Sequence, residues 1–163
     1  MDEKIFFSLY NLAQKNRCLG EIALFATKAS SKVFFVVYAA LLIYLGLQRD
    51  VKTLIVCVVI PLIALFVTLL IRKIVHRPRP YQTFDIDIRV EKKGKFSFPS
   101  NHSASAGIIA ITCLYCYVPL GIVMCILVLL TGTSRVFSGV HYPSDVLAGF
   151  VLSSVIGLIY IFL

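Results

Sequence analysis

Two long apolar runs, residues 51–71 and 144–163, constrain the fold of this chain more than any other feature of its sequence. A helix needs about 20 predominantly apolar residues to cross the hydrocarbon core of a bilayer, and both runs reach that length. Composition agrees, because 59% of the 163 residues are hydrophobic and the mean hydropathy is +0.90. A soluble domain is nearer half apolar. We therefore predict that both runs are transmembrane helices.

Three shorter runs lie at residues 33–48, 103–118 and 119–134. Each is nearly free of charged side chains and can extend into its flanks, so we predict that each also crosses the membrane. Only short polar stretches separate the runs. The sequence therefore predicts a single domain over residues 1–163 and leaves no room for a second one.

The N-terminal residues 5–28 have a different pattern. Apolar side chains recur at helical spacing at Ile5, Leu9 and Leu12, and the polar run 15–17 then interrupts them. This pattern predicts an amphipathic helix at the membrane interface, followed by a second short segment at 20–28. The predicted fold class is all-α: a polytopic membrane helix bundle of five to six transmembrane helices with an amphipathic N-terminal segment.

The net charge of +8 is unevenly distributed along the chain. Nine of the sixteen Lys and Arg residues occupy 72–95 and position 135. No motif that reads RNA or DNA accompanies them, so the sequence favours phosphate-bearing lipids and membrane lipids as partners over nucleic acid. Alternating spans bring the long polar loop at 72–99 and the short link at 134–145 to the same membrane face. The candidate chemistry is therefore concentrated at one end of the bundle.

Arginines and a helix N-terminus on that face suit a phosphate group. The guanidinium groups of Arg79 and Arg135 stay charged and can each hold two phosphate oxygens, although interface anchoring is an equally ordinary role. Ser100 and the backbone N–H groups near Asn101 and His102 precede an apolar helix. Free N–H groups at such a helix start bind anions, and the alternative is a plain helix cap.

His141 and Asp145 are four residues apart, and Pro143 between them can open a helix. This spacing puts both side chains on one face, where the carboxylate can hold one imidazole nitrogen and leave the other free to attack phosphorus. A histidine alone near a membrane surface more often has a structural role. With Asp145 and the arginines nearby, the pattern favours His141 as the nucleophile and His102 as the general acid.

These residues form motifs that resemble the type 2 phosphatidic acid phosphatase superfamily, which shares its site with vanadium haloperoxidases. The third motif, S-R-x5-H-x3-D, is complete and runs from Ser134 and Arg135 to His141 and Asp145. The second motif, P-S-G-H, is present at 99–102 with Asn in place of Gly. The resemblance covers about residues 30–163 and implies six spans, the first of them shortened within 5–28.

The first motif of the family, K-x6-R-P, departs from its usual form. Seven residues before Arg79 the sequence has Arg72 where the family has lysine, while Lys73 lies one position away. Adjacent helix positions point about 100° apart, so only one of the two can face the pocket. Arg72 has the register of the motif, and the alternative is a helix distortion that brings Lys73 in instead.

The resemblance implies a metal-independent reaction, without a cofactor, through a phosphohistidine on His141. Asp145 would orient that side chain, and His102 would protonate the departing lipid group. The resemblance implies that five residues bind the phosphate oxygens: Arg72, Arg79, Ser100, Asn101 and Arg135. Lys73 and Ser134 are further candidates for this role.

Within the superfamily, the small size and the N-terminal sequence are most similar to bacterial undecaprenyl diphosphate phosphatases. A phosphatidylglycerophosphate or phosphatidic acid phosphatase is the alternative, because no motif records the shape of the lipid pocket. A non-catalytic membrane scaffold or transporter is a more remote one. The resemblance implies a multi-pass protein of the cell membrane with its site on the extracytoplasmic face, whereas the basic residues at 72–95 favour the cytoplasmic face.

Overall fold

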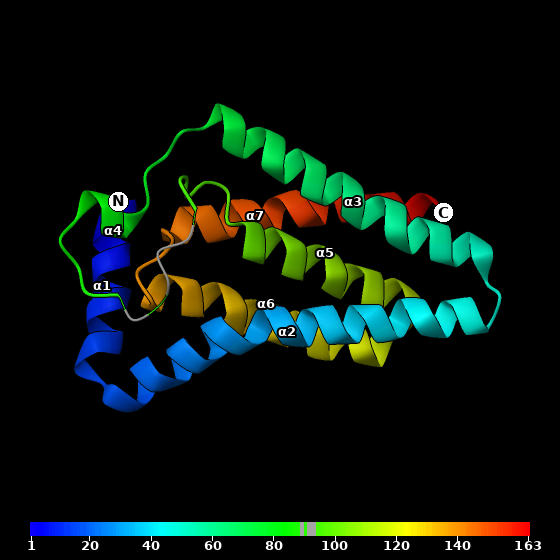
Figure 1. The fold of residues 1–163 in the computed structure, drawn as a ribbon, viewed down its shortest axis with the longest axis horizontal. Helices are drawn as coiled ribbons and strands as arrows, with labels where there is room; N and C mark the ends of the chain where they lie inside the picture. The colour runs from blue at the N-terminus through cyan, green and yellow to red at the C-terminus, as the bar shows by residue number, and fades with distance from the viewer. Residues whose placement is uncertain (89, 91–93) are drawn as a thin grey trace.

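The computed structural model of the chain describes residues 1–88, 90 and 94–163, and their regular secondary structure is helical throughout. The predicted basic loop is described in part, since Arg89, Lys92 and Lys93 lie outside the described residues. The predicted all-α, polytopic bundle is confirmed. Long helices run side by side, and a short N-terminal helix lies across one end of them (Figure 1).

Two helices form the N-terminal part, α1 (Asp2–Lys15) and α2 (Arg17–Leu47). They break at Asn16, inside the polar run that interrupts the apolar pattern. The Asn16 side chain caps α2 by accepting a hydrogen bond from the Leu19 N–H at 3.1 Å. The predicted separate segment at 20–28 is wrong, because α2 continues through it for 31 residues.

The remaining long helices follow the predicted runs closely. They are α3 (Val51–Ile74), α5 (Asn101–Cys116), α6 (Val118–Phe137) and α7 (Pro143–Gly157), and α7 is extended by the 3-10 helix η1 (Leu158–Phe162). A single turn, α4 (Pro80–Thr83), lies in the connection between α3 and α5. Within the described residues, four helices are long and apolar enough to cross a membrane: α2, α3, α6, and α7 with η1.

The shorter helix α5 lies among these spans and forms the centre of the bundle. It packs closely against α7, because small residues let the two backbones approach. A Cβ added to Gly149 of α7 would lie 2.9 Å from the Ser100 carbonyl oxygen, and one added to Gly107 of α5 would lie 2.2 Å from the Ser153 hydroxyl. The N-terminal ends of α5 and α7 are therefore held against each other.

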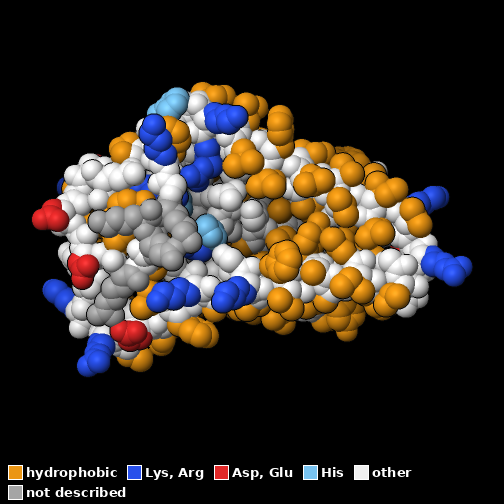
Figure 2. Space-filling model, viewed as in Figure 1, with side chains coloured by type: hydrophobic (Ala, Val, Ile, Leu, Met, Phe, Trp, Pro, Cys, Tyr) orange, Lys and Arg blue, Asp and Glu red, His pale blue; other side chains and the backbone are white. Residues whose placement is uncertain are grey.

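The outer faces of the long helices are apolar and exposed. Phe25, Phe35 and Phe66 are 74%, 70% and 68% exposed. Figure 2 shows hydrophobic side chains over most of the bundle, whereas Lys and Arg side chains gather mainly at the end where α1 lies. An apolar surface of this extent suits contact with lipid chains.

Helix α1 has two faces, as expected for an interfacial helix. Phe6, Tyr10 and Ala13 are buried against the bundle, while Ile5 and Leu12 of the predicted apolar stripe are 45% and 52% exposed. Ile5 and Leu12 therefore face outward, whereas Leu9, the third residue of the stripe, packs against the buried cluster that contains Phe6 and Tyr10. Phe6 stacks against Tyr10 and contacts Tyr142, beside the candidate site. This packing attaches α1 to the end of the bundle that carries the chemistry.

Candidate active site

The candidate residues meet at the end of the bundle next to α1. The C-terminal ends of α3 and α6 and the N-terminal ends of α5 and α7 all lie at this end (Figure 1). The Ser100 N–H donates a hydrogen bond to the Asp145 carbonyl oxygen at 2.9 Å, which joins the second motif directly to the third. The loop at 72–99 and the link at 134–145 therefore meet at one end of the bundle, as predicted.

The first turn of α7 brings His141 and Asp145 together. Pro143 occupies the start of the helix, and Asp145 accepts a hydrogen bond from the Tyr142 N–H at 2.8 Å through Oδ2. The same oxygen lies 3.4 Å from Nδ1 of His141. The two atoms lack the alignment of a hydrogen bond. Catalytic contacts of this kind often shorten only when substrate binds.

Burial controls the charge of His141, which lies in the link between α6 and α7 and is 1% exposed. Loss of hydration lowers the pKa of His141 to about 4; Asp145 opposes this shift and the positive charge of Arg79 adds to it. The imidazole is therefore neutral near pH 7. A neutral imidazole held by a carboxylate is the form that can act as a nucleophile.

Arg77, which the sequence patterns did not single out, makes the closest side-chain contact to Asp145. Its Nη1 donates to Asp145 Oδ1 at 2.8 Å and to the Ser144 hydroxyl at 2.6 Å. Its guanidinium carbon lies 4.0 Å from the centre of the Tyr142 ring. Both carboxylate oxygens of Asp145 are thus engaged, and its side chain is fully buried.

The other side of Arg77 contacts α1. Its Nη2 donates to Asp2 Oδ2 at 2.6 Å, and the Ser144 backbone N–H donates to Asp2 Oδ1 at 3.1 Å. Arg77 therefore lies between two carboxylates, one from each end of the chain. No local pattern indicates this pairing, because Asp2 and Arg77 are 75 positions apart.

Arg79 and Arg135 have a different environment. Nη1 of Arg79 donates to the Val140 carbonyl oxygen at 3.3 Å, and Nη2 of Arg135 donates to the Thr27 carbonyl oxygen at 3.2 Å. The Nε atoms of both arginines are buried without a hydrogen-bond partner among the described residues. Within that part of the chain neither has a carboxylate partner. Their charge is available to an anion.

A cavity of about 480 Å³ opens between these arginines. It is lined by Arg79, His102 and Arg135, together with α2 side chains that include Lys28 and Lys32. Figure 2 shows a hollow with a histidine in it, bordered by Lys and Arg side chains. The structure thus brings together the two arginines that were predicted to bind phosphate and the histidine that was predicted to be the general acid. An anionic group bound here would meet several cations at once.

Other predicted residues lie next to this cavity and do not line it. Ser100 is the N-cap of α5, and its hydroxyl accepts from the Ser103 hydroxyl at 2.9 Å. The Asn101 side chain lines a neighbouring pocket, and its Oδ1 is buried without a partner among the described residues. Ser134 packs toward α2, where its hydroxyl oxygen accepts from Thr27 at 3.1 Å.

Arg72 and Lys73 point in different directions. Arg72 is partly buried; its Nη1 donates to the Pro99 carbonyl oxygen at 2.9 Å, and its Nη2 contacts the Phe96 carbonyl oxygen. Lys73 is exposed. The inward residue is thus the one expected from the motif spacing. Its contacts hold the segment immediately before Ser100.

Comparison with known proteins gives several relatives. The chain is 28% identical over 160 residues to undecaprenyl-diphosphatase BcrC of Bacillus subtilis, which covers 98% of this chain and 82% of that protein. It is 36% identical over 94 residues to decaprenylphosphoryl-5-phosphoribose phosphatase of Mycobacterium tuberculosis, which covers 57% of this chain and 51% of that protein.

Two solved structures share the fold. Aquifex aeolicus LpxE superimposes with a TM-score of 0.80 at 21% identity and covers 99% of this chain and 95% of that one. A phosphatidylglycerolphosphate phosphatase of Bacillus subtilis superimposes with a TM-score of 0.76 at 21% identity, covering 97% of this chain and 83% of that one. The family model described as the PAP2 superfamily matches residues 52–162, which contain all three motifs. The chain therefore belongs to the PAP2 superfamily of membrane lipid phosphatases.

Proposed function

We propose that this protein removes the terminal phosphate of a lipid diphosphate, converting undecaprenyl diphosphate to undecaprenyl phosphate through a phosphohistidine on His141. The observation that carries the proposal is the cationic cavity of Arg79, His102 and Arg135 beside a buried, neutral His141. The match to an undecaprenyl-diphosphatase over nearly the whole chain supports the choice of lipid.

In the first step, the imidazole of His141 attacks the terminal phosphorus. Its Nδ1 faces Asp145, so Nε2 is the attacking atom. The new P–N bond forms as the P–O bond to the lipid phosphate breaks, and His102 gives its proton to the departing oxygen. The negative charge of the bound substrate favours the protonated form of His102 before this transfer.

In the second step, water attacks the phosphohistidine. His102 accepts the proton of the water, the P–N bond breaks, and its electron pair returns to His141 as inorganic phosphate leaves. Arg79 and Arg135, and Arg72 through the segment it holds, stabilise the charge that develops on the phosphate oxygens. These side chains supply every proton and charge that the two steps require, so we propose a metal-independent reaction.

The decisive experiment measures phosphate release by the purified protein in detergent. The substrates are undecaprenyl diphosphate, phosphatidylglycerophosphate and phosphatidic acid, each with and without EDTA. We expect the highest kcat/KM with the diphosphate, no effect of EDTA, and competitive inhibition by vanadate, which mimics a five-coordinate phosphate. A preference for either of the other lipids would assign the alternative activity, and EDTA inactivation reversed by magnesium would refute metal independence.

His141→Ala is the matching variant. It should reduce turnover by at least about 10⁴-fold and abolish the acid-labile phosphoenzyme, because no neighbouring group can replace the nucleophile. Substantial turnover by a folded His141→Ala protein would contradict the proposed mechanism. Absence of activity on all three lipids by the wild type would favour a scaffold or transporter.

We further propose that the active site opens on the extracytoplasmic side of the cell membrane. Cys18 provides a native probe, because it is exposed near the start of α2, at the same end of the bundle as the site. A membrane-impermeant maleimide should label the wild type in intact cells and not a Cys18→Ser variant. Labelling that requires permeabilised cells would place the site on the cytoplasmic side.

A further inference from the structure

We propose that Lys28 and Lys32 of α2 bind the second phosphate of a lipid diphosphate, the one that remains on the lipid after hydrolysis. This assignment rests on the proposed function and names the residues that would select a diphosphate over a monophosphate. Both lysines precede residues 52–162, the region matched by the family model, and neither belongs to the three motifs.

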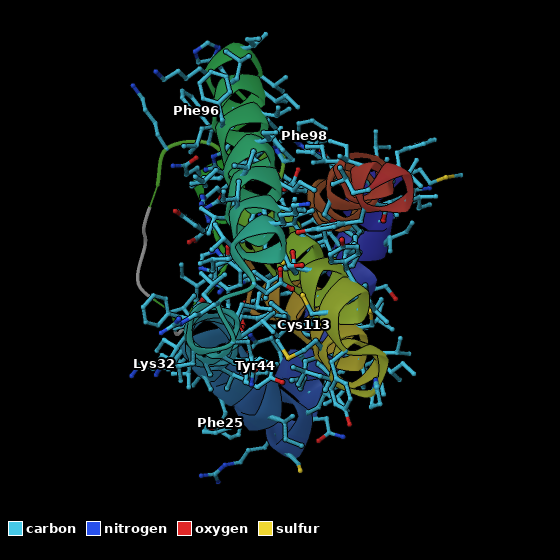
Figure 3. The ribbon with its side chains drawn as sticks, turned by 90° about the vertical axis from the view of Figure 1, so that its right-hand side faces the viewer. Phe25, Lys32, Tyr44, Phe96, Phe98 and Cys113 are labelled. Atoms are coloured by element: carbon cyan, nitrogen blue, oxygen red, sulfur yellow. The ribbon has the colours of Figure 1, made fainter. Side chains whose placement is uncertain are left out.

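The two lysines share one face of α2, since they are four residues apart on a continuous helix. Both line the 480 Å³ cavity that contains Arg79, His102 and Arg135. In Figure 3, Lys32 points to the side on which the α3–α5 connection runs, whereas Phe25 of the same helix points away from the bundle. The α2 side chains that line the cavity are therefore polar or charged: Thr27, Lys28, Ser31 and Lys32.

Thr27 fixes this part of α2 against the phosphate-binding helix α6. Its hydroxyl donates to the Ser134 carbonyl oxygen at 3.2 Å and contacts the Ser138 hydroxyl at 3.0 Å. Its carbonyl oxygen accepts from Arg135. Lys28 follows Thr27 directly, so its backbone is held beside a guanidinium group that we assign to the transferred phosphate.

The order of side chains along α2 matches the order of groups in a lipid diphosphate. Thr27 lies at the level of Arg135, Lys28 follows it directly, Lys32 lies one turn further along, and Phe35 comes next. Phe35 lines an apolar pocket of about 250 Å³ that shares His102 and Ser31 with the cationic cavity. A phosphate between the reacting phosphate and an isoprenoid chain would therefore lie at the lysines.

The charge of the cavity also exceeds the needs of one phosphate. Among the described residues, its lining includes four cations, Lys28, Lys32, Arg79 and Arg135, and no carboxylate. A phosphate monoester carries at most two negative charges, and the two arginines already balance these. The two lysines supply the additional positive charge that a second phosphate requires, on flexible side chains suited to a group that is bound without being transferred.

The test compares two substrates that differ only in the second phosphate, farnesyl diphosphate and farnesyl phosphate. The double variant Lys28→Gln/Lys32→Gln should lose about tenfold or more in kcat/KM for the diphosphate and less than about twofold for the monophosphate. Lys28→Arg/Lys32→Arg should retain most of the activity. A control variant, Lys15→Gln/Lys95→Gln, removes two exposed charges outside the cavity and should affect neither substrate selectively.

Binding measured in a His141→Ala background makes the test independent of turnover. The lysine double variant should weaken the Kd for farnesyl diphosphate about tenfold and leave that for farnesyl phosphate nearly unchanged. Equal weakening for both ligands, or none for the diphosphate, would overturn the assignment of the lysines. Failure of the wild type to hydrolyse either substrate would instead refute the proposed function, and the binding comparison would still decide the role of the lysines.

Discussion

Arg77 forms one group of arginines at this end of the bundle, and Arg79 and Arg135 form a second group whose hydrogen-bond partners differ. Arg77 has a carboxylate on each side, Asp2 at 2.6 Å and Asp145 at 2.8 Å. Arg79 and Arg135 have only backbone carbonyl oxygens as hydrogen-bond acceptors in the described part of the chain, and each has a buried Nε without a partner. Among the described residues, carboxylates neutralise the first group and not the second.

This difference in partners separates an arginine that positions a catalytic side chain from arginines that bind a ligand. A buried cation without a carboxylate is unfavourable for the folded state by itself, so its presence is best explained by an anionic ligand that pairs with it. A cation already held by two carboxylates has no charge left for a ligand. Arg77 instead fixes the carboxylate that orients His141. Variants of the two groups should therefore affect activity and stability in opposite proportions.

Among the arginine variants, the largest effect on activity is expected for Arg135→Met, which removes the guanidinium and keeps most of the aliphatic stem. Loss of one preorganised charge at the phosphate should lower kcat/KM about 10²–10³-fold. The melting temperature in detergent should stay the same or rise, because an unpaired buried cation has been removed. A fall in melting temperature large enough to explain the lost activity would show that Arg135 is mainly structural.

Arg72 and Lys73 give the next largest contrast. Arg72→Ala should lower kcat/KM about 10–100-fold, since it removes charged hydrogen bonds to the segment that carries Ser100. Arg72→Lys should retain much of the activity, because it restores the cation usual in this family. Lys73→Ala should be nearly silent, given that its side chain is exposed. A severe defect in Lys73→Ala beside a mild one in Arg72→Ala would reverse the assignment.

Arg77→Met is the counterpart of Arg135→Met and makes the same chemical change. It leaves the Asp145 Oδ1 buried without its donor, so we expect a loss of about 1–3 kcal/mol in the free energy of unfolding. Activity should fall about tenfold, less than in Arg135→Met, because the imidazole of His141 remains. Asp145→Asn combined with Arg77→Met should cost less than the sum of the two single variants. Additive losses would mean that Arg77 does not act through Asp145.

The spans were largely predictable because their signal is local. Run length and hydropathy identify α3, α6 and α7, and the polar residues at 15–17 mark the break between α1 and α2. The error at 20–28 has a physical cause. Lys28 and Lys32 interrupt the apolar pattern of α2, yet the helix continues because both side chains face the polar cavity and not lipid.

The site was predictable where spacing alone fixes geometry. The interval of four residues places His141 near Asp145, and the motif register places Arg72 inward and Lys73 outward. The Asp2–Arg77 contact could not be found in this way. It depends on how α1 folds back over the end of the bundle, and no residue pattern near either position encodes that path.

The smallest effect is expected for Asp2→Asn, which tests whether the network of Asp145 and Arg77 extends to Asp2 of α1. Partial burial raises the pKa of Asp2, but hydrogen bonds from Ser144 and Arg77 outweigh it, and the net pKa is lowered. The charged form therefore stabilises the fold above the usual carboxyl pKa of about 3.9, and this contribution is lost as pH falls through the lower folded value. Wild type should be more stable than Asp2→Asn by about 1 kcal/mol at pH 7.

That difference should shrink below about pH 4, since protonated Asp2 no longer carries the charge that the variant lacks. Activity at pH 7 should fall only about two- to threefold, because Arg77 keeps its contact with Asp145. Glu3→Gln is the matched control: it removes the same charge from the neighbouring exposed position and should change neither property. Thermal unfolding and kcat/KM across pH measure both effects. If Asp2→Asn behaved like Glu3→Gln at every pH, the network that orients His141 would end at Arg77, and α1 would contribute to the site only through the packing of Phe6 and Tyr10.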